Sequence, residues 1–319
     1  MKSVNIVTEN TKEYEKVKIQ GKTICLPHPT PVSDYLFIGR DALIDKALAA
    51  FMHVDGCTPL NFRLYGPPGV GKNALVYELA KILKKDLYII NGHEELGPED
   101  VACSPTIVSK NMIEYVASPL FAAMLRGGIC FFDEIGKAPQ SALDPLASVL
   151  DDRRSITSVL AGIHLKAHPE FLFCAALNED EETGVGLPGF IDERTRPSIY
   201  VGYPLEAEME EILKSRLNVV PEKWVSVLIS HFKQVKLSPR LTITLLEYAY
   251  KMSKRKNGKV KNLSKEEIKK YLVHAYSHVN PHDERGTQVQ TRGSNKKEED
   301  HSGEVYGDFS LSKEKETVH

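Results

Sequence analysis

A glycine-rich stretch, GPPGVGKNALVYEL, has residue types and a spacing suited to holding phosphate groups. Gly66, Gly69 and Gly71 permit backbone conformations that side chains forbid, so that N–H groups can converge on phosphate oxygens. Lys72 adds a cation for the outer phosphates. An apolar run, NFRLY, precedes the loop and a helical pattern follows it, which places the loop at a helix N-terminus, where anions are favoured. The predicted nucleotide-binding residues are Gly66, Pro67, Pro68, Gly69, Val70, Gly71, Lys72, Asn73 and Ala74.

Asn73 stands where this pattern usually has a Ser or Thr hydroxyl that ligates Mg²⁺. Asn instead offers a neutral carbonyl oxygen on a longer, planar side chain. Three outcomes are open: the amide oxygen ligates the metal, a water bridges the gap, or nucleotide binds with a weakened metal. Asn also suits the first turn of a helix.

Two carboxylates follow a second apolar run, in GGICFFDEIGKAP. Asp133 and Glu134 are then expected at the carboxyl edge of the sheet, where α/β proteins bind ligands. In a phosphate-loop protein Asp133 holds the Mg²⁺ shell and Glu134 acts as the general base for the attacking water. A third run, EFLFCAALN, ends at Asn178, whose amide is placed to orient that water or to contact the γ-phosphate.

Three arginines complete the candidate constellation. Arg194 and Arg196 precede a last strand, and an arginine there can reach a neighbouring subunit's nucleotide and stabilise transition-state charge. In SPRLTITLL, Ser238 can cap a helix with Arg240 in its first turn, where the dipole disfavours a cation and a nearby phosphate would explain one. The candidate catalytic residues are Glu134, Asn178, Arg194, Arg196 and Arg240, and the candidate metal ligands are Asn73 and Asp133.

The elements that must position these residues form four successive regions. Residues 1–37 are an N-terminal extension with a possible hairpin around Gly21. In residues 38–204 short apolar runs alternate with helical patterns, which predicts an α/β fold with a three-layer parallel sheet. Residues 205–280 read as an all-α lid domain, whose last helix opens with a capping box at Ser264. Residues 281–319 are polar and charged, which predicts a disordered tail.

Composition narrows the function classes. The chain has 319 residues, and its 41 Lys and Arg nearly balance its 43 Asp and Glu, which disfavours nucleic acid as a partner. The five cysteines form no C-x-x-C pair and no apolar run reaches the length of a membrane span, so we expect a cytoplasmic protein without a membrane span. The histidine pairs His164/His168 and His274/His278 lack the companions of a metal site. The basic loop Lys251 to Lys261 is expected to be solvated.

With these motifs in order, the chain resembles the AAA+ ATPases, and more narrowly the MoxR-like group of the dynein-related branch. The resemblance covers roughly residues 35–277. Three further stretches carry it: LGPEDVACSP, ASPLFAAML and the hairpin-like RRSITSVLAGIHLKAHPEFLF.

The resemblance implies a P-loop fold, ATP and Mg²⁺ as cofactors, and ATP hydrolysis. It makes Asp133 and Glu134 the Walker B pair, Asn178 the first sensor, Arg240 the second sensor, and Arg194 or Arg196 the arginine finger. It also implies a homo-oligomer, a hexameric ring, that acts as a chaperone-like remodeller of a protein client, often one with a von Willebrand factor A domain.

The sequence departs from the pattern of that family at three places. Asn73 replaces the hydroxyl residue, Glu179 stands where proline is usual and begins an acidic run, and ERTRP replaces the usual Arg-Phe. Two alternatives to the ATPase therefore stay open. One is a nucleotide-gated scaffold in which Asn73 abolishes turnover, and the other is a nucleic-acid motor.

Overall fold

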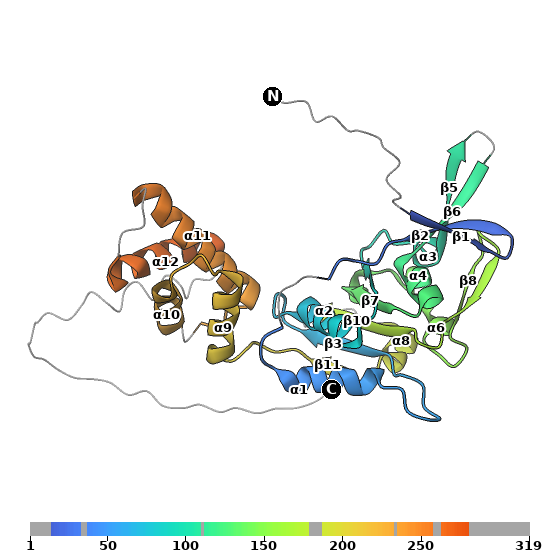
Figure 1. Ribbon diagram of the computed structural model, residues 1–319, viewed down its shortest axis with the longest axis horizontal. Coiled ribbons are helices and arrows are strands. Elements are labelled where there is room, and N and C mark those ends of the chain that lie inside the picture. The colour runs from blue at the N-terminus through green and yellow to red at the C-terminus, as the bar shows by residue number, and fades with distance from the viewer. Residues whose placement is uncertain are drawn as a thin grey trace, which may run out of the picture.

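The computed structural model describes residues 14–32, 37–109, 112–178, 187–232, 235–257 and 263–280. The predicted tail at 281–319, the acidic run that begins at Glu179 and residues 1–13 lie outside these ranges. The stretch from Lys251 to Lys261 was expected to be a loop, but residues 251–257 are helical, and residues 258–261 lie outside the described ranges. Within them, the chain forms a sheet-containing domain followed by four helices (Figure 1).

The first domain is built on a five-stranded sheet whose neighbours all run parallel. Its strand order is β11-β3-β10-β7-β4, so the chain crosses over between strands through helices. The strands read as apolar runs because both faces are covered. They are β3 (Phe62–Gly66), β4 (Leu87–Asn91), β7 (Ile129–Asp133), β10 (Leu172–Asn178) and β11 (Ser198–Tyr200).

Helices on both faces complete three layers. Side chains from α1 (Asp41–Phe51) and α2 (Lys72–Leu83) pack with one set of alternating strand residues. Side chains from α4 (Pro119–Arg126), α6 (Leu146–Val149) and α8 (Gly189–Arg194) pack with the other set. This arrangement confirms the predicted three-layer parallel sheet. The remaining short helices are α3 (Pro98–Val101), η1 (Ile135–Lys137) and α5 (Gln140–Leu143).

A second, four-stranded sheet lies beside α4. The sequence predicted a hairpin around Gly21 but not the sheet that this hairpin joins. The hairpin of β1 (Tyr14–Ile19) and β2 (Lys22–Pro27) turns at Gln20 and Gly21, and β2 continues the sheet by pairing in parallel with β6. A hairpin of β5 (Cys103–Ser109) and β6 (Met112–Ala117) forms its other half. The stretch that resembles a family hairpin forms β8 (Ser155–Ser158) and β9 (Ile163–Lys166).

The C-terminal region is helical and has its own core. It consists of α9 (Glu206–Arg216), α10 (Glu222–His231), α11 (Pro239–Asn257) and α12 (Lys265–Val279). Trp224 is buried at its centre, with the ring of Tyr250 at 5.5 Å in an edge-on arrangement. The capping box predicted at Ser264 is present, since its hydroxyl accepts a bond from the backbone of Glu267 while that carboxylate accepts one from the backbone of Ser264.

The five cysteines all lie in the described part of the chain and are free thiols. Cys57 is exposed in the turn between α1 and β3, and the other four are buried. Burial raises the pKa of Cys103 to about 12 and raises that of Cys130 and Cys174 as well. Among the described residues no cluster of three or more His, Cys, Asp and Glu side chains could hold a metal ion, and no helix has the length and apolar character needed to cross a membrane.

Candidate nucleotide site

The loop between β3 and α2 has the backbone that its glycines predict. Gly66, Gly69 and Gly71 have φ angles of 144°, 76° and 106°, a region that favours glycine. A side chain at residue 66 would also collide with the carbonyl of Val201, because its Cβ would lie 2.3 Å from that oxygen. The loop therefore turns tightly between the sheet and the first turn of α2, where helix N–H groups are available to an anion.

Lys72 lies at the base of this loop and is only 7% exposed. Its ammonium group donates hydrogen bonds to the carbonyl of Gly66 at 2.7 Å and to Oδ1 of Asn178 at 3.0 Å. The parallel pairing of β3 with β10 sets Asn178 opposite Gly66, which explains why residues over a hundred positions apart meet. Lys72 and Asn178 are thus brought together, as the motifs suggested.

Asn73 and Asp133 form the second contact of the site. Nδ2 of Asn73 donates to Oδ2 of Asp133 at 2.6 Å, so the amide faces the carboxylate with its donor end. Burial, and secondarily the charge of Glu134, raise the pKa of Asp133, while the bond from Asn73 acts in the opposite direction. Burial and the neighbouring negative charge both disfavour the ionised form of this carboxylate, and a cation bound beside it would offset them.

Glu134 follows Asp133 with a φ of 52°, which turns its side chain out of the strand direction. Its carboxylate pairs with the ammonium group of Lys137 at 2.8 Å, one turn later in η1. Sequence reasoning did not select Lys137, although a basic residue three positions after a candidate general base was a usable signal.

The helical domain closes the site from the other side. The backbone N–H of Arg240 donates to the carbonyl of Gly69 at 3.4 Å, and a Cβ at Gly69 would lie 2.8 Å from the hydroxyl oxygen of Ser238. Ser238 also accepts from the backbone of Leu241, as the predicted helix cap requires. The start of α11 is therefore packed directly on the phosphate-binding loop.

Between the two domains lies a cavity of about 410 Å³. Its walls include the predicted groups Lys72, Asn73, Asp133, Glu134, Asn178 and Arg240. Residues that sequence reasoning missed also line it: Phe37, Ile38, Arg40, Ile212, Arg216, Ile243 and Thr244. The missed residues come from the segment before α1 and from α9 and α11, so they lie outside the phosphate loop and the strand ends, although Ile243 and Thr244 follow Arg240 in the same helix.

Arg40 is the most informative of the missed residues. Its guanidinium lies over the ring of Phe37 at 4.4 Å and donates to the carbonyl of Val70 at 2.9 Å, while its Nε is buried without a hydrogen-bond partner. Burial lowers the pKa of Arg40. An unpaired buried donor on the cavity wall fits a site that awaits a polar ligand.

Arg194 and Arg196 lie apart from this cavity, at the end of α8 and just before β11. Arg194 donates to the carbonyl of Phe190 at 3.0 Å. Arg196 pairs with Asp192 at 2.6 Å. Neither arginine lines the cavity of its own chain.

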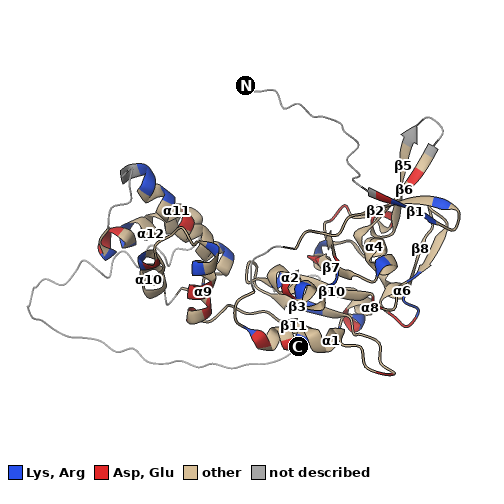
Figure 2. Ribbon diagram, in the orientation of Figure 1, with Lys and Arg blue, Asp and Glu red and all other residues tan. Residues whose placement is uncertain are grey.

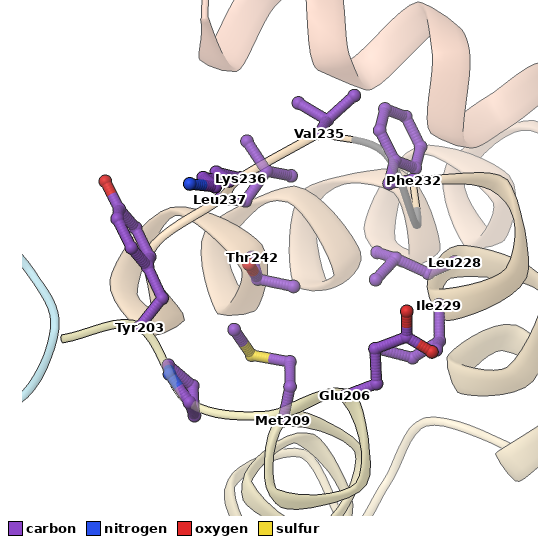
Figure 3. Close-up of a pocket in the computed structure, with 11 residues that line it drawn as sticks. Tyr203, Glu206, Met209, Leu228, Ile229, Phe232, Val235, Lys236, Leu237 and Thr242 are labelled. Atoms are coloured by element: carbon purple, nitrogen blue, oxygen red, sulfur yellow. The ribbon is translucent and has the colours of Figure 1, made fainter.

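A second pocket, of about 150 Å³, lies within the helical domain (Figure 3). Its lining is mostly apolar, with Met209, Leu228 and Phe232 around the space and Lys236 and Glu206 as the charged residues. It holds none of the predicted site residues. Basic and acidic residues are interspersed along the described parts of both domains (Figure 2), in keeping with the balanced composition.

Comparison with known proteins agrees with this geometry. Residues 61–188 match the AAA domain of the dynein-related subfamily. Uncharacterized proteins of Staphylococcus aureus strain USA300 and of Staphylococcus epidermidis are 35% and 34% identical over 123 residues, which are 37% of this chain and 47% of each relative. The chain therefore matches about half the length of these relatives.

Solved structures show the same fold. The Holliday junction branch migration motor RuvB of Thermotoga maritima superimposes with a TM-score of 0.51 at 19% identity, covering 76% of this chain and 71% of that chain. A mutant of that RuvB gives a TM-score of 0.56 at 19% identity, covering 78% and 74%.

Proposed function

We propose that this chain, whose residues 61–188 match the AAA domain of the dynein-related subfamily, is an ATPase of the MoxR-like type that works as a ring and remodels a protein client. The observation that carries the proposal is the pair of side-chain contacts at the strand ends, Lys72 to Asn178 and Asn73 to Asp133. They bring together the residues that we propose as the phosphate loop, the first sensor and the Walker B carboxylate.

The residues present fit ATP with Mg²⁺. The glycine backbone and Lys72 would hold the phosphates, Arg40 and Phe37 border the same cavity, and Asn73 and Asp133 would hold the metal. Mg²⁺ would supply Lewis-acid stabilisation of charge on the phosphate oxygens. Glu134 would take the proton of the attacking water, and Arg240 would add positive charge from the helical domain.

The contact between Asn73 and Asp133 favours ATP hydrolysis over the alternative of a scaffold that binds nucleotide without turnover. A Ser or Thr hydroxyl carries a donor and an acceptor on one oxygen, whereas the Asn amide carries them on separate atoms. Here the nitrogen donates to Asp133, which leaves the amide oxygen as the ligand for a cation. We therefore propose that Asn73 replaces the hydroxyl with its own oxygen and needs no bridging water.

The position of the arginines supports assembly into a ring. Because Arg194 and Arg196 do not line the cavity of their own chain, an arginine finger would have to act on a neighbour's nucleotide, as a closed ring allows. We propose a cytoplasmic hexamer with a protein client, possible clients including those with a von Willebrand factor A domain.

Steady-state phosphate release tests the proposal. The wild type, Glu134→Gln and Asn73→Thr are compared with ATP and Mg²⁺ over protein concentrations that span assembly. We expect wild-type turnover that rises with assembly and falls by about 10²–10⁴-fold in Glu134→Gln, since a general base is removed without loss of ATP binding. Asn73→Thr should bind ATP and stay active.

Two other results would select the alternatives. ATP binding without turnover in the wild type, with turnover restored by Asn73→Thr, would identify a nucleotide-gated scaffold. Turnover that requires DNA and falls steeply with salt would identify a nucleic-acid motor.

A further inference from the structure

Arg63 is a charged side chain inside the sheet, where the strand pattern calls for an apolar one. It lies in β3, between Phe62 and Leu64, and is 3% exposed. Those two neighbours face the core beneath α1 and α2, so Arg63 faces the opposite layer, which contains α8. A buried guanidinium is costly unless its donors are paired, so its partners indicate what it does.

The side-chain hydrogen bonds and the ion pair recorded for Arg63 all go to one segment, residues 192–198. Its Nη2 pairs with Oδ1 of Asp192 at 2.6 Å, and Nη1 donates to the carbonyl of the same residue at 3.1 Å. Nη1 also donates to the hydroxyl of Thr195 at 3.3 Å, and Nε donates to that of Ser198 at 3.1 Å. One side chain therefore fixes the end of α8, the connection after it and the start of β11.

That segment carries both candidate arginine fingers. Arg196 is held by Asp192, the same carboxylate that Arg63 binds, whereas the recorded bond of Arg194 goes to a backbone carbonyl within its own helix. We infer that Arg63 is a positioning residue, which fixes this segment so that Arg194 reaches the nucleotide of the next subunit. The inference rests on the proposed function, because it needs a ring with shared sites.

A purely structural role makes a different prediction. If Arg63 only held β11 against β3, its loss would disturb the carboxyl end of β3, where the phosphate loop begins. ATP binding in the same chain would then weaken. A positioning role affects the site of the neighbour. The two roles are separable because Lys72 would bind the ATP of its own subunit, whereas Arg63 would act, through Arg194, on the ATP of the next subunit.

The test measures ATP binding and phosphate release for Arg63→Met, with Arg63→Lys as a second variant if the first fails to fold. Methionine suits the buried position, and Asp192 keeps Arg196 as its partner. Arg154→Met is the control, since Arg154 is a partly buried arginine that donates to the carbonyl of Phe171 at 2.7 Å and lies outside the proposed site. Arg194→Ala gives the turnover expected when the proposed arginine finger is absent.

We expect Arg63→Met to assemble and to bind ATP within about twofold of the wild type while turnover falls about 10²-fold, as a displaced catalytic group costs. Mixing it with Lys72→Ala subunits, which lack a phosphate-binding lysine but carry an ordered finger segment, should raise turnover about tenfold over either variant alone. Mixing Arg63→Met with Arg194→Ala subunits should not raise turnover, because neither variant supplies a correctly placed arginine finger.

Failure of rescue by Lys72→Ala, a parallel loss of ATP binding, or unchanged turnover would overturn the inference. If Arg194→Ala retains full activity, the finger assignment is wrong and the inference fails with it. If the assembled wild type has no turnover, the proposed function itself has failed, which the wild-type control reveals separately.

Discussion

Asp192 is a single carboxylate shared by two guanidinium groups. One oxygen binds Arg63 and the other binds Arg196, each at 2.6 Å, although the side chain is 36% exposed. The bond from Arg196, and then the bond from Arg63, lower the pKa of Asp192, while partial burial acts in the opposite direction. The charge of this residue therefore contributes to folding in a pH-dependent way.

Asp192→Asn should lower the free energy of unfolding at pH 7 by about 1 kcal/mol, a value reduced for solvent screening. The folded-state pKa is depressed, so the contribution is fully present above the unfolded-state value, about 3.9, and is lost as pH falls through the folded-state value. Urea unfolding of both proteins from pH 7 to pH 3 should show the difference shrinking at the acid end. A difference that stays constant with pH would contradict this origin.

Residues that belong to a local motif could be recognised from the sequence. Asp133 and Asn178 end apolar strands and Lys72 belongs to the glycine-rich loop after another strand, and parallel strands deliver their carboxyl ends to one edge of the sheet. The roles of Arg40 and Arg63 depend on partners that the crossover topology brings in from far along the chain. No local pattern marks such partners, and an arginine within a strand gives no sign of whether its charge is paired.

At the scale of elements, α12 shows how a short signal sets a helix boundary. Ser264 precedes the helix, and its hydroxyl and the Glu267 carboxylate satisfy backbone N–H groups that the first turn leaves open. The same helix supplies Leu272 and Tyr276 to the core around Trp224, so its start position affects the whole helical domain.

Ser264→Ala should destabilise the helical domain by about 1 kcal/mol, since the cap is lost. Ser277→Ala is the matched control, because its hydroxyl lies late in the same helix and donates to the carbonyl of His274 one turn earlier; we expect a change within about 0.5 kcal/mol. Fluorescence of Trp224 during urea unfolding measures both. Equal effects of the two substitutions would argue against the cap.

The parallel strands were predictable because burial on both faces gives each an apolar run, as in ICFFD of β7. The sheet that joins β2 to β6 was not, because its strands carry exposed residues such as Ile107 and Ile113 and because β2 and β6 pair across more than eighty residues. Such pairing leaves no periodic signal that identifies the partner strand.

At the scale of the whole molecule, the two domains meet at the nucleotide site. Glu208 of α9 accepts from the backbone N–H of Arg40 at 2.8 Å, and the start of α11 contacts Gly69. A ligand in the cavity would therefore contact both domains at once, so its binding should stabilise both.

Nucleotide at about 100 times its dissociation constant should add about 2.7 kcal/mol to the unfolding transition that Trp224 reports in the helical domain. Arg240→Ala should reduce that gain, because the domain loses a charged contact with the ligand. Lys251→Ala on the same helix, whose partner is the exposed Glu247, should keep it. Thermal unfolding followed by Trp224 fluorescence, with and without MgADP, measures the gain in stability. Equal gains in the wild type, Arg240→Ala and Lys251→Ala would refute the coupling between nucleotide binding and the helical domain.

The exposed thiol of Cys57 gives the protein a selective chemical handle. The other four thiols are shielded by packing, so a maleimide dye should attach at one place, on the sheet-containing domain. The chain has one tryptophan, Trp224, and it lies in the helical domain. With a dye chosen as its energy acceptor, the native chain becomes a spectroscopic ruler between its two domains, without any mutation.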